Sequence, residues 1–541
     1  MPTSSPASLA EAIERAAQQG EGRGFRFVKN DKWVDTFFAF EDIETETRRI
    51  AGALQDIGLR KGDRCALIQP DNAAFVMSFL GALRAGIVPV PIYPPMGSGQ
   101  LAGYLENTSH IVRKSGARAL VTAPVVKGLL GKVQSSCPSL DTITTHAALQ
   151  QSNRSFTPVD VSGDDVAFLQ FTSGSTAKPK GVVVTHGNLL ANIENIVVEG
   201  LRIDPKVDAA LSWLPLYHDM GLIGFVLAPV VATIQTTFLT PLMFLYRPAC
   251  WLRALSHYDA GMTFGPNFAY ALCVKRIRDK ELEGVNLAHW RVAGCGAEPI
   301  RAETLQAFAD RFSAYGFRKE AFYPAYGLAE STLAVSFARG LPTDVVRAST
   351  LWSEGRAEPC AADSRDALRI VSCGPAFAKH EVGVFALDDD AGEEPLVERD
   401  VGEIRLRGPS VFQRYFDDPE TSERSFAGGW FRTGDLGYVA DGDTYICGRA
   451  KELLIVRGRN YYPQDIEWEA SQVEGVRKGN VIAFGTVGTD SQGEGVVLVF
   501  ETGHPQSQRE ALCSAIRERI MEFTGLELDD VVPVDPGVLP K

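Results

Sequence analysis

The sequence predicts an α/β fold, because segments typical of strands and of helices alternate through its N-terminal part. Strand-like runs at 25–28 and 65–68 are separated by helical spacing over 40–57, and a second helical pattern covers 72–85. This alternation is typical of βαβ units. Four prolines within 88–95 exclude a helix there. With 541 residues the chain is too long for one hydrophobic core, so several domains are expected.

The composition is that of an ordinary globular protein, with 45% hydrophobic and 22% charged residues. A net charge of −13 argues against non-specific binding to nucleic acid. Residues 8–19 are predicted as a helix rather than a secretory signal, and no apolar run is long enough for a transmembrane segment. The nine scattered cysteines lack a C-x-x-C pair and indicate buried thiols rather than disulfides or zinc. Together these features predict a cytoplasmic protein.

A loop at 171–181, rich in hydroxyl groups, is the strongest functional signal. It reads Phe-Thr-Ser-Gly-Ser-Thr-Ala-Lys-Pro-Lys-Gly and lies between predicted strands at 165–170 and 182–185. Glycines allow consecutive N–H groups to face an anion, and lysines add positive charge. The spacing differs from a Walker A loop, which places its Lys after the second Gly and before a helix. We predict a polyphosphate-binding loop; the alternative is a simple hairpin turn.

Further candidate residues follow predicted strands. An apolar strand is expected to end at Pro215, which places Tyr217, His218 and Asp219 on a loop where α/β sheets bind ligands. Residues 221–233 carry almost no polar side chains and are predicted as a buried helix, which either fills the core or walls an apolar tunnel. Residues 261–270 contain no acidic residue; this run resembles the acyl-pocket segment of adenylate-forming enzymes, in which amino-acid-activating members have an Asp, and the resemblance therefore implies an uncharged, apolar substrate group.

The C-terminal half adds three motifs. The run at 292–299 contains Gly-x-Gly, but Pro299 excludes a dinucleotide fingerprint. Within 323–332, Tyr326 offers a flat face for a purine and Glu330 is a suitable Mg²⁺ ligand. Within 429–437, the carboxylate of Asp435 can accept two hydroxyl groups. Residues 340–366 are polar and are expected to lack regular elements.

These motifs, together with the run at 445–460, occur in the order found in adenylate-forming enzymes, and the sequence resembles that superfamily from about residue 25 onwards. The run at 91–95 and the extra length at 340–366 resemble the fatty acyl-AMP ligase branch. The resemblance implies a large N-terminal domain over 1–450, made of α/β subdomains and a β-barrel with an insertion near 340–366. It also implies a small, truncated α+β domain over 451–541.

The resemblance also implies the roles of individual residues. It implies catalytic roles for Thr172, Lys180, His218 and Glu330; ATP or AMP binding by Thr172, Ser173, Gly174, Ser175, Thr176, Gly296, Ala297, Glu298, Tyr326, Gly327, Leu328, Asp435 and Arg449; an acyl pocket at Gly221, Phe225, Phe264, Gly265 and Asn267; a hinge at Lys451; and Mg²⁺ on Glu330.

The implied function is activation of a fatty acid by ATP and Mg²⁺ to an acyl-adenylate, with release of pyrophosphate. The acyl group would pass to the phosphopantetheine thiol of an acyl carrier protein, in lipid, polyketide or lipopeptide biosynthesis. One alternative is an acyl-CoA synthetase, and another is a nucleotide- and acyl-binding module with little activity. The sequence closes with Leu-Pro-Lys541, where the family continues to a catalytic lysine. Lys541 is not its equivalent, so we expect an excised piece of a longer protein or a shortened C-terminal domain.

Overall fold

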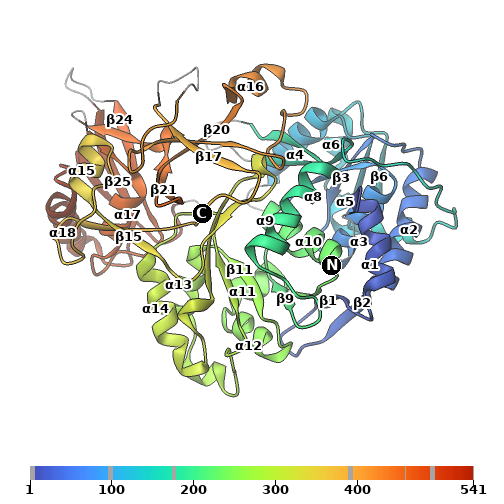
Figure 1. Ribbon diagram of the computed structural model, residues 1–541, viewed down its shortest axis with the longest axis horizontal. Coiled ribbons are helices and arrows are strands. Elements are labelled where there is room, and N and C mark those ends of the chain that lie inside the picture. Colours follow the sequence, from blue (N-terminus) through green and yellow to red (C-terminus); the bar gives the residue numbers. More distant parts are fainter. Residues whose placement is uncertain are drawn as a thin grey trace.

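The largest sheet has eight strands in the order β14-β13-β12-β11-β9-β10-β1-β2. A computed structural model describes residues 6–95, 101–172, 178–387, 394–456, 459–487 and 494–539 (Figure 1). The strands are β1 (Gly24–Val28), β2 (Asp35–Ala39), β9 (Ala209–Ser212), β10 (Gln235–Phe238), β11 (Met262–Gly265), β12 (Val292–Cys295), β13 (Phe322–Gly327) and β14 (Ala334–Phe337). All neighbours pair in parallel except the edge strands β2 and β14. The carboxyl ends of the parallel strands therefore meet at one edge, where α/β sheets bind ligands.

A second, four-stranded parallel sheet has the order β4-β3-β5-β6, and an antiparallel hairpin of β7 and β8 accompanies it. The strands are β3 (Arg64–Ile68), β4 (Val88–Pro91), β5 (Ala119–Thr122), β6 (Thr142–Thr145), β7 (Val166–Thr172) and β8 (Lys180–Thr185). The hairpin confirms the two strands predicted on either side of the hydroxyl-rich loop. Loop residues Ser173, Gly174, Ser175 and Thr176 lie outside the described residues.

The helices of this part of the chain pack against both sheets (Figure 1). They are α1 (Leu9–Gln19), α2 (Phe40–Asp56), α3 (Asn72–Arg84), α4 (Leu101–Ser115), α5 (Pro124–Lys127), α6 (Gly131–Ser136), α7 (His146–Gln150), α8 (His186–Glu194), α9 (Asp219–Leu222), α10 (Ala228–Ala232), α11 (Pro241–Tyr246), α12 (Ala249–His257), α13 (Asn267–Arg276) and α14 (Ala302–Phe312). The α1, α2 and α3 positions agree with the predicted helices to within about two residues. None of the helices in the described part of the chain is both long and apolar enough to cross a bilayer.

Beyond residue 340 the chain forms antiparallel sheets. A five-stranded sheet contains β17 (Glu381–Phe385), β18 (Gly402–Arg407), β19 (Phe426–Ala427), β20 (Trp430–Ala440) and β21 (Asp443–Arg449). The hairpin of β15 (Thr343–Arg347) and β16 (Ala367–Val371) lies beside it, through a bridge between Ser372 and Tyr445. These sheets occupy the place of the expected β-barrel. The short helix α16 (Pro419–Arg424) precedes β19.

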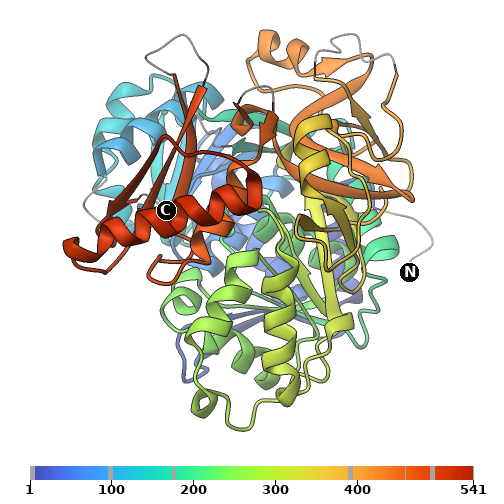
Figure 2. The same ribbon diagram turned by 90° about the vertical axis from the view of Figure 1, so that its left-hand side faces the viewer.

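The C-terminal elements form a three-stranded sheet of β24 (Val481–Val487), β25 (Glu494–Glu501) and β26 (Asp530–Val534). Helices α17 (Pro463–Ser471) and α18 (Gln506–Thr524) accompany it, and Figure 2 shows α18 lying across the strands. The hairpin of β22 (Leu454–Val456) and β23 (Arg459–Tyr461) connects this sheet to β21. This is the α+β arrangement predicted for the C-terminal part, although its boundary at residue 451 remains a prediction.

The helix expected over 221–233 is confirmed, because α9, a π-helical segment at Ile223–Leu227 and α10 follow one another without a break. Two other local predictions need correction. The strand expected to reach Pro215 ends at Ser212, because β9 extends only as far as its pairing with β10. The segment 340–366, expected to be irregular, holds β15 and the helix α15 (Ala348–Glu354), because tertiary packing buries Leu351 and Trp352 there. Seven of the nine cysteines are buried free thiols, as predicted, whereas Cys360 and Cys513 are half-buried.

We predict that Phe25→Ala lowers the free energy of unfolding by about 3–5 kcal/mol, the range typical of a buried aromatic residue. Phe25 is fully buried and packs edge-to-face on Phe40 and Phe238, both with ring centroids 5.4 Å away. Urea denaturation of the two proteins measures the loss. Val34→Ala is the control, because Val34 is 51% exposed and should change little. Equal losses for both variants would contradict this view of the core.

Candidate active site

A cavity of about 570 Å³ lies at the carboxyl edge of the large sheet. Its lining includes residues that follow β9, β12 and β13, together with the ends of β7, β8 and β21. Ala297, just after β12, has a φ of 68°, a strained backbone conformation for a non-glycine residue. A Cβ on the preceding Gly296 would lie 2.9 Å from the carbonyl oxygen of Ala325. A glycine there lets the segments after β12 and within β13 approach each other beside the cavity.

The hairpin brings two predicted site residues together. Thr172 ends β7 and Lys180 begins β8, and the two are paired in the ladder. Both line the cavity, with Lys178 and Pro179 next to them. The ammonium of Lys180 lies 5.1 Å from the centre of the Tyr415 ring, a cation–π contact. The positive charge of the hairpin is therefore directed into the cavity.

Glu330 lies on a short 3₁₀ turn, Ala329–Ser331, that follows β13 and lines the cavity. Its Oε1 accepts a 2.8 Å hydrogen bond from the Tyr415 hydroxyl. Burial raises the pKa of the Glu330 carboxyl, and the hydrogen bond from Tyr415 opposes that rise. The described residues include no cluster of three or more potential metal ligands. A single carboxylate beside a hairpin that carries lysines still fits Mg²⁺, which takes one or two protein carboxylates plus phosphate oxygens.

Tyr326 and Asp435 form a buried pair at another wall of the cavity. The Tyr326 hydroxyl donates a 2.7 Å hydrogen bond to Oδ2 of Asp435, and Nε of Arg449 lies 3.1 Å from Oδ1. Burial raises the pKa of Asp435, and the charge of Arg449 counteracts it. Tyr326 and Arg449 line the cavity, but Asp435 does not; Thr433 and Gly434 before it do. Tyr326 and Arg449 thus contact both carboxylate oxygens of Asp435, and the binding of two hydroxyl groups by this carboxylate stays a prediction.

His218 and Asp219 also line the cavity, after β9. Nδ1 of His218 lies 2.6 Å from Oδ1 of Asp219, and the negative charge of Asp219 raises the pKa of His218. Gln170 on β7 fixes this loop, because its Nε2 donates a 3.1 Å hydrogen bond to the carbonyl oxygen of Tyr217. A half-exposed histidine with a carboxylate partner is thus held between the hairpin and the apolar part of the cavity.

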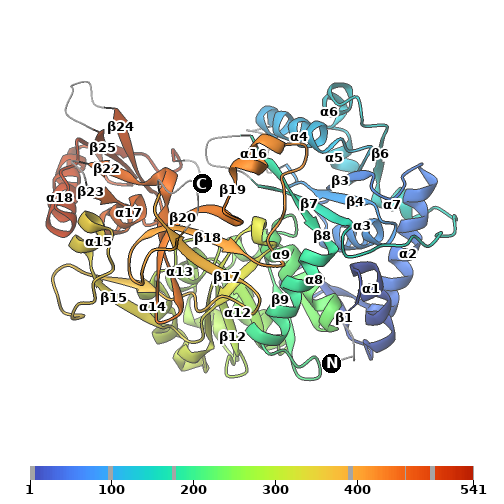
Figure 3. The same cartoon turned by 45° about the horizontal axis from the view of Figure 1, so that its top comes forward.

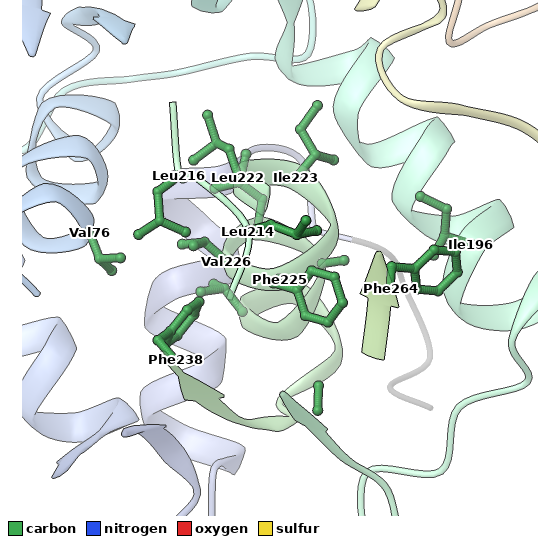
Figure 4. Packing of buried hydrophobic residues seen from close by; sticks show 14 of the residues in the cluster. Val76, Ile196, Leu214, Leu216, Leu222, Ile223, Phe225, Val226, Phe238 and Phe264 are labelled. Atoms are coloured by element: carbon green, nitrogen blue, oxygen red, sulfur yellow. The ribbon is translucent and has the colours of Figure 1, made fainter. Parts of the chain in front are cut away.

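The apolar part of the cavity is formed by side chains from β9, β11, β14 and the 221–233 segment. Phe225 and Phe264 line it and lie 6.3 Å apart between ring centroids, with Ile196 beside them (Figure 4). Met262 and Phe337 extend the same wall. The helix at 221–233 therefore does both things left open by the sequence. Phe225 lines the apolar part of the cavity, whereas Leu222 and Val226 are buried in the hydrophobic core.

Four other predicted site residues do not line the cavity. A Cβ on Gly221 would lie 2.2 Å from the carbonyl oxygen of Pro215, and Gly265 packs against Trp251, so close packing occupies both positions. Asn267 begins α13 and its Oδ1 accepts a hydrogen bond from the Arg301 N–H. Glu298 accepts a 2.5 Å hydrogen bond from the Phe268 N–H instead of facing a ligand. Gly327, Leu328 and Lys451 line the cavity, while nucleotide binding by the first two and the hinge role of Lys451 stay predictions.

Sequence reasoning missed Tyr415 and Gln170. Tyr415 lies between β18 and β19 and reaches the cavity through an isolated bridge to Val182 on β8. No local pattern marks it, because its neighbours at the site come from residues 180 and 330. Gln170 is an uncharged polar residue at the end of an otherwise apolar predicted strand. That change of polarity is the one signal in the sequence that could have marked it as a site residue.

The parallel sheet, the lysine-bearing hairpin and the divided cavity are consistent with an enzyme of the adenylate-forming class. The chain belongs to the AMP-binding enzyme family, whose model matches residues 14–416. It is therefore an ATP-dependent adenylate-forming ligase, and the resemblance stated from the sequence is confirmed.

Relatives of full length support this assignment. A Caulobacter vibrioides protein, provisionally described as an acyl-CoA synthetase, is 36% identical over 96% of this chain and 90% of its own. The medium-chain-fatty-acid–[acyl-carrier-protein] ligase TtuA of Teredinibacter turnerae is 31% identical over 99% of this chain and 91% of its own. A structure from a study of fatty acyl-adenylate ligases of E. coli and L. pneumophila has a TM-score of 0.92 and 34% identity, and covers 99% of this chain and 95% of that one.

We predict that Glu330→Gln stabilises the ligand-free protein by roughly 1 kcal/mol at neutral pH. The folded-state pKa of Glu330 is raised above its usual 4.5, so the ionised carboxylate disfavours the folded state at neutral pH. Below pH 4.5 the group is increasingly protonated in both states, and the difference between the proteins should vanish. Thermal unfolding across this pH range measures it. The control is Glu320→Gln at an exposed position; a pH-independent difference for Glu330→Gln would contradict the assignment.

Proposed function

We propose that this protein activates a fatty acid with ATP to an acyl-adenylate and releases pyrophosphate. The observation that carries the proposal is the division of one cavity into a charged side and an apolar side. Lys180, Glu330 and Arg449 lie on the charged side, and Phe225 and Phe264 lie on the apolar side. No acidic residue between 261 and 270 is available to pair a substrate ammonium. The names of relatives such as TtuA agree with a fatty acid substrate.

In the proposed reaction a carboxylate oxygen of the fatty acid forms a bond to the α-phosphorus of ATP. The bond from that phosphorus to the bridging oxygen breaks, and pyrophosphate leaves with its electron pair. A fatty carboxylate is ionised at neutral pH, so no base is needed and catalysis consists of positioning and charge stabilisation. Lys180 and the backbone near Thr172 would bind the departing phosphates. His218, with its raised pKa, would place a positive donor near the carboxylate.

The nucleoside is proposed to lie against Tyr326, next to the cradle of Gly296 and Ala297. In this arrangement Asp435 orients Tyr326 and Arg449 through its two carboxylate oxygens. Each carboxylate oxygen has a further lone pair, with which Asp435 would accept a ribose hydroxyl. Glu330 would hold Mg²⁺, which supplies positive charge to the phosphates when bound. Tyr415 fixes the orientation of that carboxylate.

Pyrophosphate exchange with fatty acids and amino acids tests this function. We expect exchange with medium or long fatty acids and little with any amino acid. Tyr415→Phe should lower the rate by about tenfold at limiting Mg²⁺, since one hydrogen bond to a charged group contributes roughly 1.5–3 kcal/mol. Glu330→Gln should lower it further, whereas exposed Glu320→Gln should match the wild type. Stronger exchange with an amino acid, or full activity of Glu330→Gln at limiting Mg²⁺, would refute the proposal.

The acceptor is proposed to be the phosphopantetheine thiol of an acyl carrier protein, and the packing of α15 supports this choice over free coenzyme A. Trp352 on α15 is buried against Tyr461 and Phe523, with ring centroids 5.9 and 5.8 Å away. Figures 1 and 3 show α15 beside the C-terminal elements. The insertion would therefore restrain rotation of the C-terminal part about the proposed hinge at Lys451.

A second contact supports the same restraint. Nη2 of Arg301, at the start of α14, lies 2.9 Å from Oδ1 of Asp465 and donates a 2.7 Å hydrogen bond to the carbonyl oxygen of Gln464. Both charged side chains are largely buried, and the guanidinium lies over the Trp468 ring. Removing one partner of a buried ion pair is strongly destabilising. The C-terminal part is thus fastened to the large sheet through α14 and to the insertion through α15.

We predict that the wild-type protein, supplied with acyl-adenylate, loads a carrier protein and forms little acyl-CoA. Trp352→Ala removes two aromatic contacts, each worth about 0.5–1.5 kcal/mol beyond burial, and should raise acyl-CoA formation by roughly fivefold or more. Thermal unfolding verifies that the variant is folded, and Glu354→Ala on the exposed side of α15 is the control. Abundant acyl-CoA from the wild type would favour the acyl-CoA synthetase alternative. An unchanged ratio in Trp352→Ala would contradict restraint by α15.

A further inference from the structure

Four large apolar side chains are exposed together on α11 and at the start of α13. Leu242, Leu245 and Tyr246 occupy positions i, i+3 and i+4 of α11, which places them on one helix face. Their exposed fractions are 55%, 41% and 75%. Phe268 on α13 is 43% exposed. We call these four residues the α11–α13 patch; Figure 1 labels the two helices.

Contacts beneath the surface join the two helices into one patch. Phe244, on the buried face of α11, stacks on Trp213 at 3.9 Å, and Phe268 meets the edge of the same indole at 6.3 Å. Nη1 of Arg276, at the end of α13, donates a 3.2 Å hydrogen bond to the carbonyl oxygen of Leu245. The exposed side chains therefore rest on a rigid aromatic base and do not depend on a flexible loop.

Basic side chains flank the patch. Arg247 follows α11, and Lys275 and Arg276 end α13; all three are exposed. Lys275 and Arg276 have no ion pair with a carboxylate among the described residues. Of the neighbouring acids, Asp31, Asp279 and Glu281 pair with Arg247, Arg311 and Arg278, and Glu298 accepts a hydrogen bond from the backbone N–H of Phe268. Local positive charge in a chain of net charge −13 indicates an anionic counterpart at this place.

The patch lies at the same sheet edge as the active-site cavity. Trp213 directly follows β9, and Phe268 follows β11 by three residues. The same two strands supply Ala210, Met262 and Phe264 to the apolar side of the cavity. An apolar substrate that arrives at the patch is therefore already beside the strands that form the apolar wall.

We propose that the α11–α13 patch is a reversible contact with an anionic lipid surface, from which the fatty acid substrate is collected. Apolar side chains that project from a helix and have basic neighbours are typical of helices that lie in a membrane interface. Exposed apolar groups gain free energy in the acyl region, and lysine or arginine gains from anionic headgroups. A patch of four residues gives weak binding, which suits an enzyme that must leave the surface again. The collecting role rests on the proposed fatty acid function; the lipid contact does not.

Co-sedimentation with vesicles tests the contact without ATP or substrate. The probes are vesicles of phosphatidylcholine alone and of phosphatidylcholine mixed equally with phosphatidylglycerol. We expect the wild type to bind the mixed vesicles at low salt. Leu242→Ser combined with Tyr246→Ser should lower the partition coefficient at least about tenfold. Lys275→Gln should lower binding to mixed vesicles by about fivefold and leave binding to neutral vesicles unchanged.

Val207→Ser is the matched control, because Val207 is 77% exposed and precedes the opposite end of β9. Absence of vesicle binding by the wild type, or equal binding by the double variant, would overturn the proposal. If the double variant raised the KM for a carrier protein while no form bound vesicles, the patch would be a protein-docking surface instead.

Adenylation assays separate this inference from the proposed function. With a dissolved fatty acid the double variant should match the wild type, and with the fatty acid supplied in vesicles its apparent KM should rise about tenfold. Equal KM values for the two proteins with vesicle-borne substrate would refute the collecting role. Vesicle binding without adenylation of any fatty acid would refute the proposed function and leave the lipid contact standing.

Discussion

The hydrogen bond from Tyr415 to Glu330 joins the parts of the chain on which the active site depends. Tyr415 belongs to the region between β18 and β19, and Glu330 follows β13 of the large sheet. The face of the same tyrosine ring receives Lys180 from the β7–β8 hairpin. One aromatic side chain therefore sets the separation between the carboxylate proposed to hold Mg²⁺ and the ammonium group proposed to bind the phosphates. A carboxylate so placed disfavours the ligand-free fold, which is the expected cost of a pre-organised charged site.

The cavity separates charge from apolar surface because a parallel sheet presents different residues at different depths. Residues after the strand ends, such as His218 and Ala297, have backbone and side chains free to meet a polar ligand. Residues within the strands, such as Met262 and Phe264, have their backbone groups engaged in strand pairing, so only their side chains can contact a ligand. A molecule with a charged head and an apolar chain matches this division. The α11–α13 patch extends apolar surface from the same edge to the exterior.

The C-terminal part is held by two contacts of different physical character. Trp352 packs on Tyr461 and Phe523 through non-directional burial, which tolerates small rotations. Arg301 and Asp465 form a directional, buried ion pair, which does not. Rotation about the proposed hinge at Lys451 would have to break both. Restraint of this kind would select the acceptor of the acyl group without altering the cavity proposed for adenylation.

The sequence alone determined the α/β class, the helices α1 to α3, the β7–β8 hairpin and the charged cavity residues Lys180, Glu330 and Arg449, because these depend on local periodicity and on motifs of adjacent residues. It did not show the helix α15 within 340–366, since Trp352 is buried only against residues more than a hundred positions away. Nor did it show Tyr415, or the engagement of both Asp435 oxygens. Gly221, Gly265 and Asn267 lie within the predicted acyl-pocket segments but do not line the cavity. The two glycines pack closely against Pro215 and Trp251, and the Asn267 side chain accepts a hydrogen bond from Arg301. Local sequence specifies which chemical groups are available, whereas the long-range packing of strands and loops decides which of them meet.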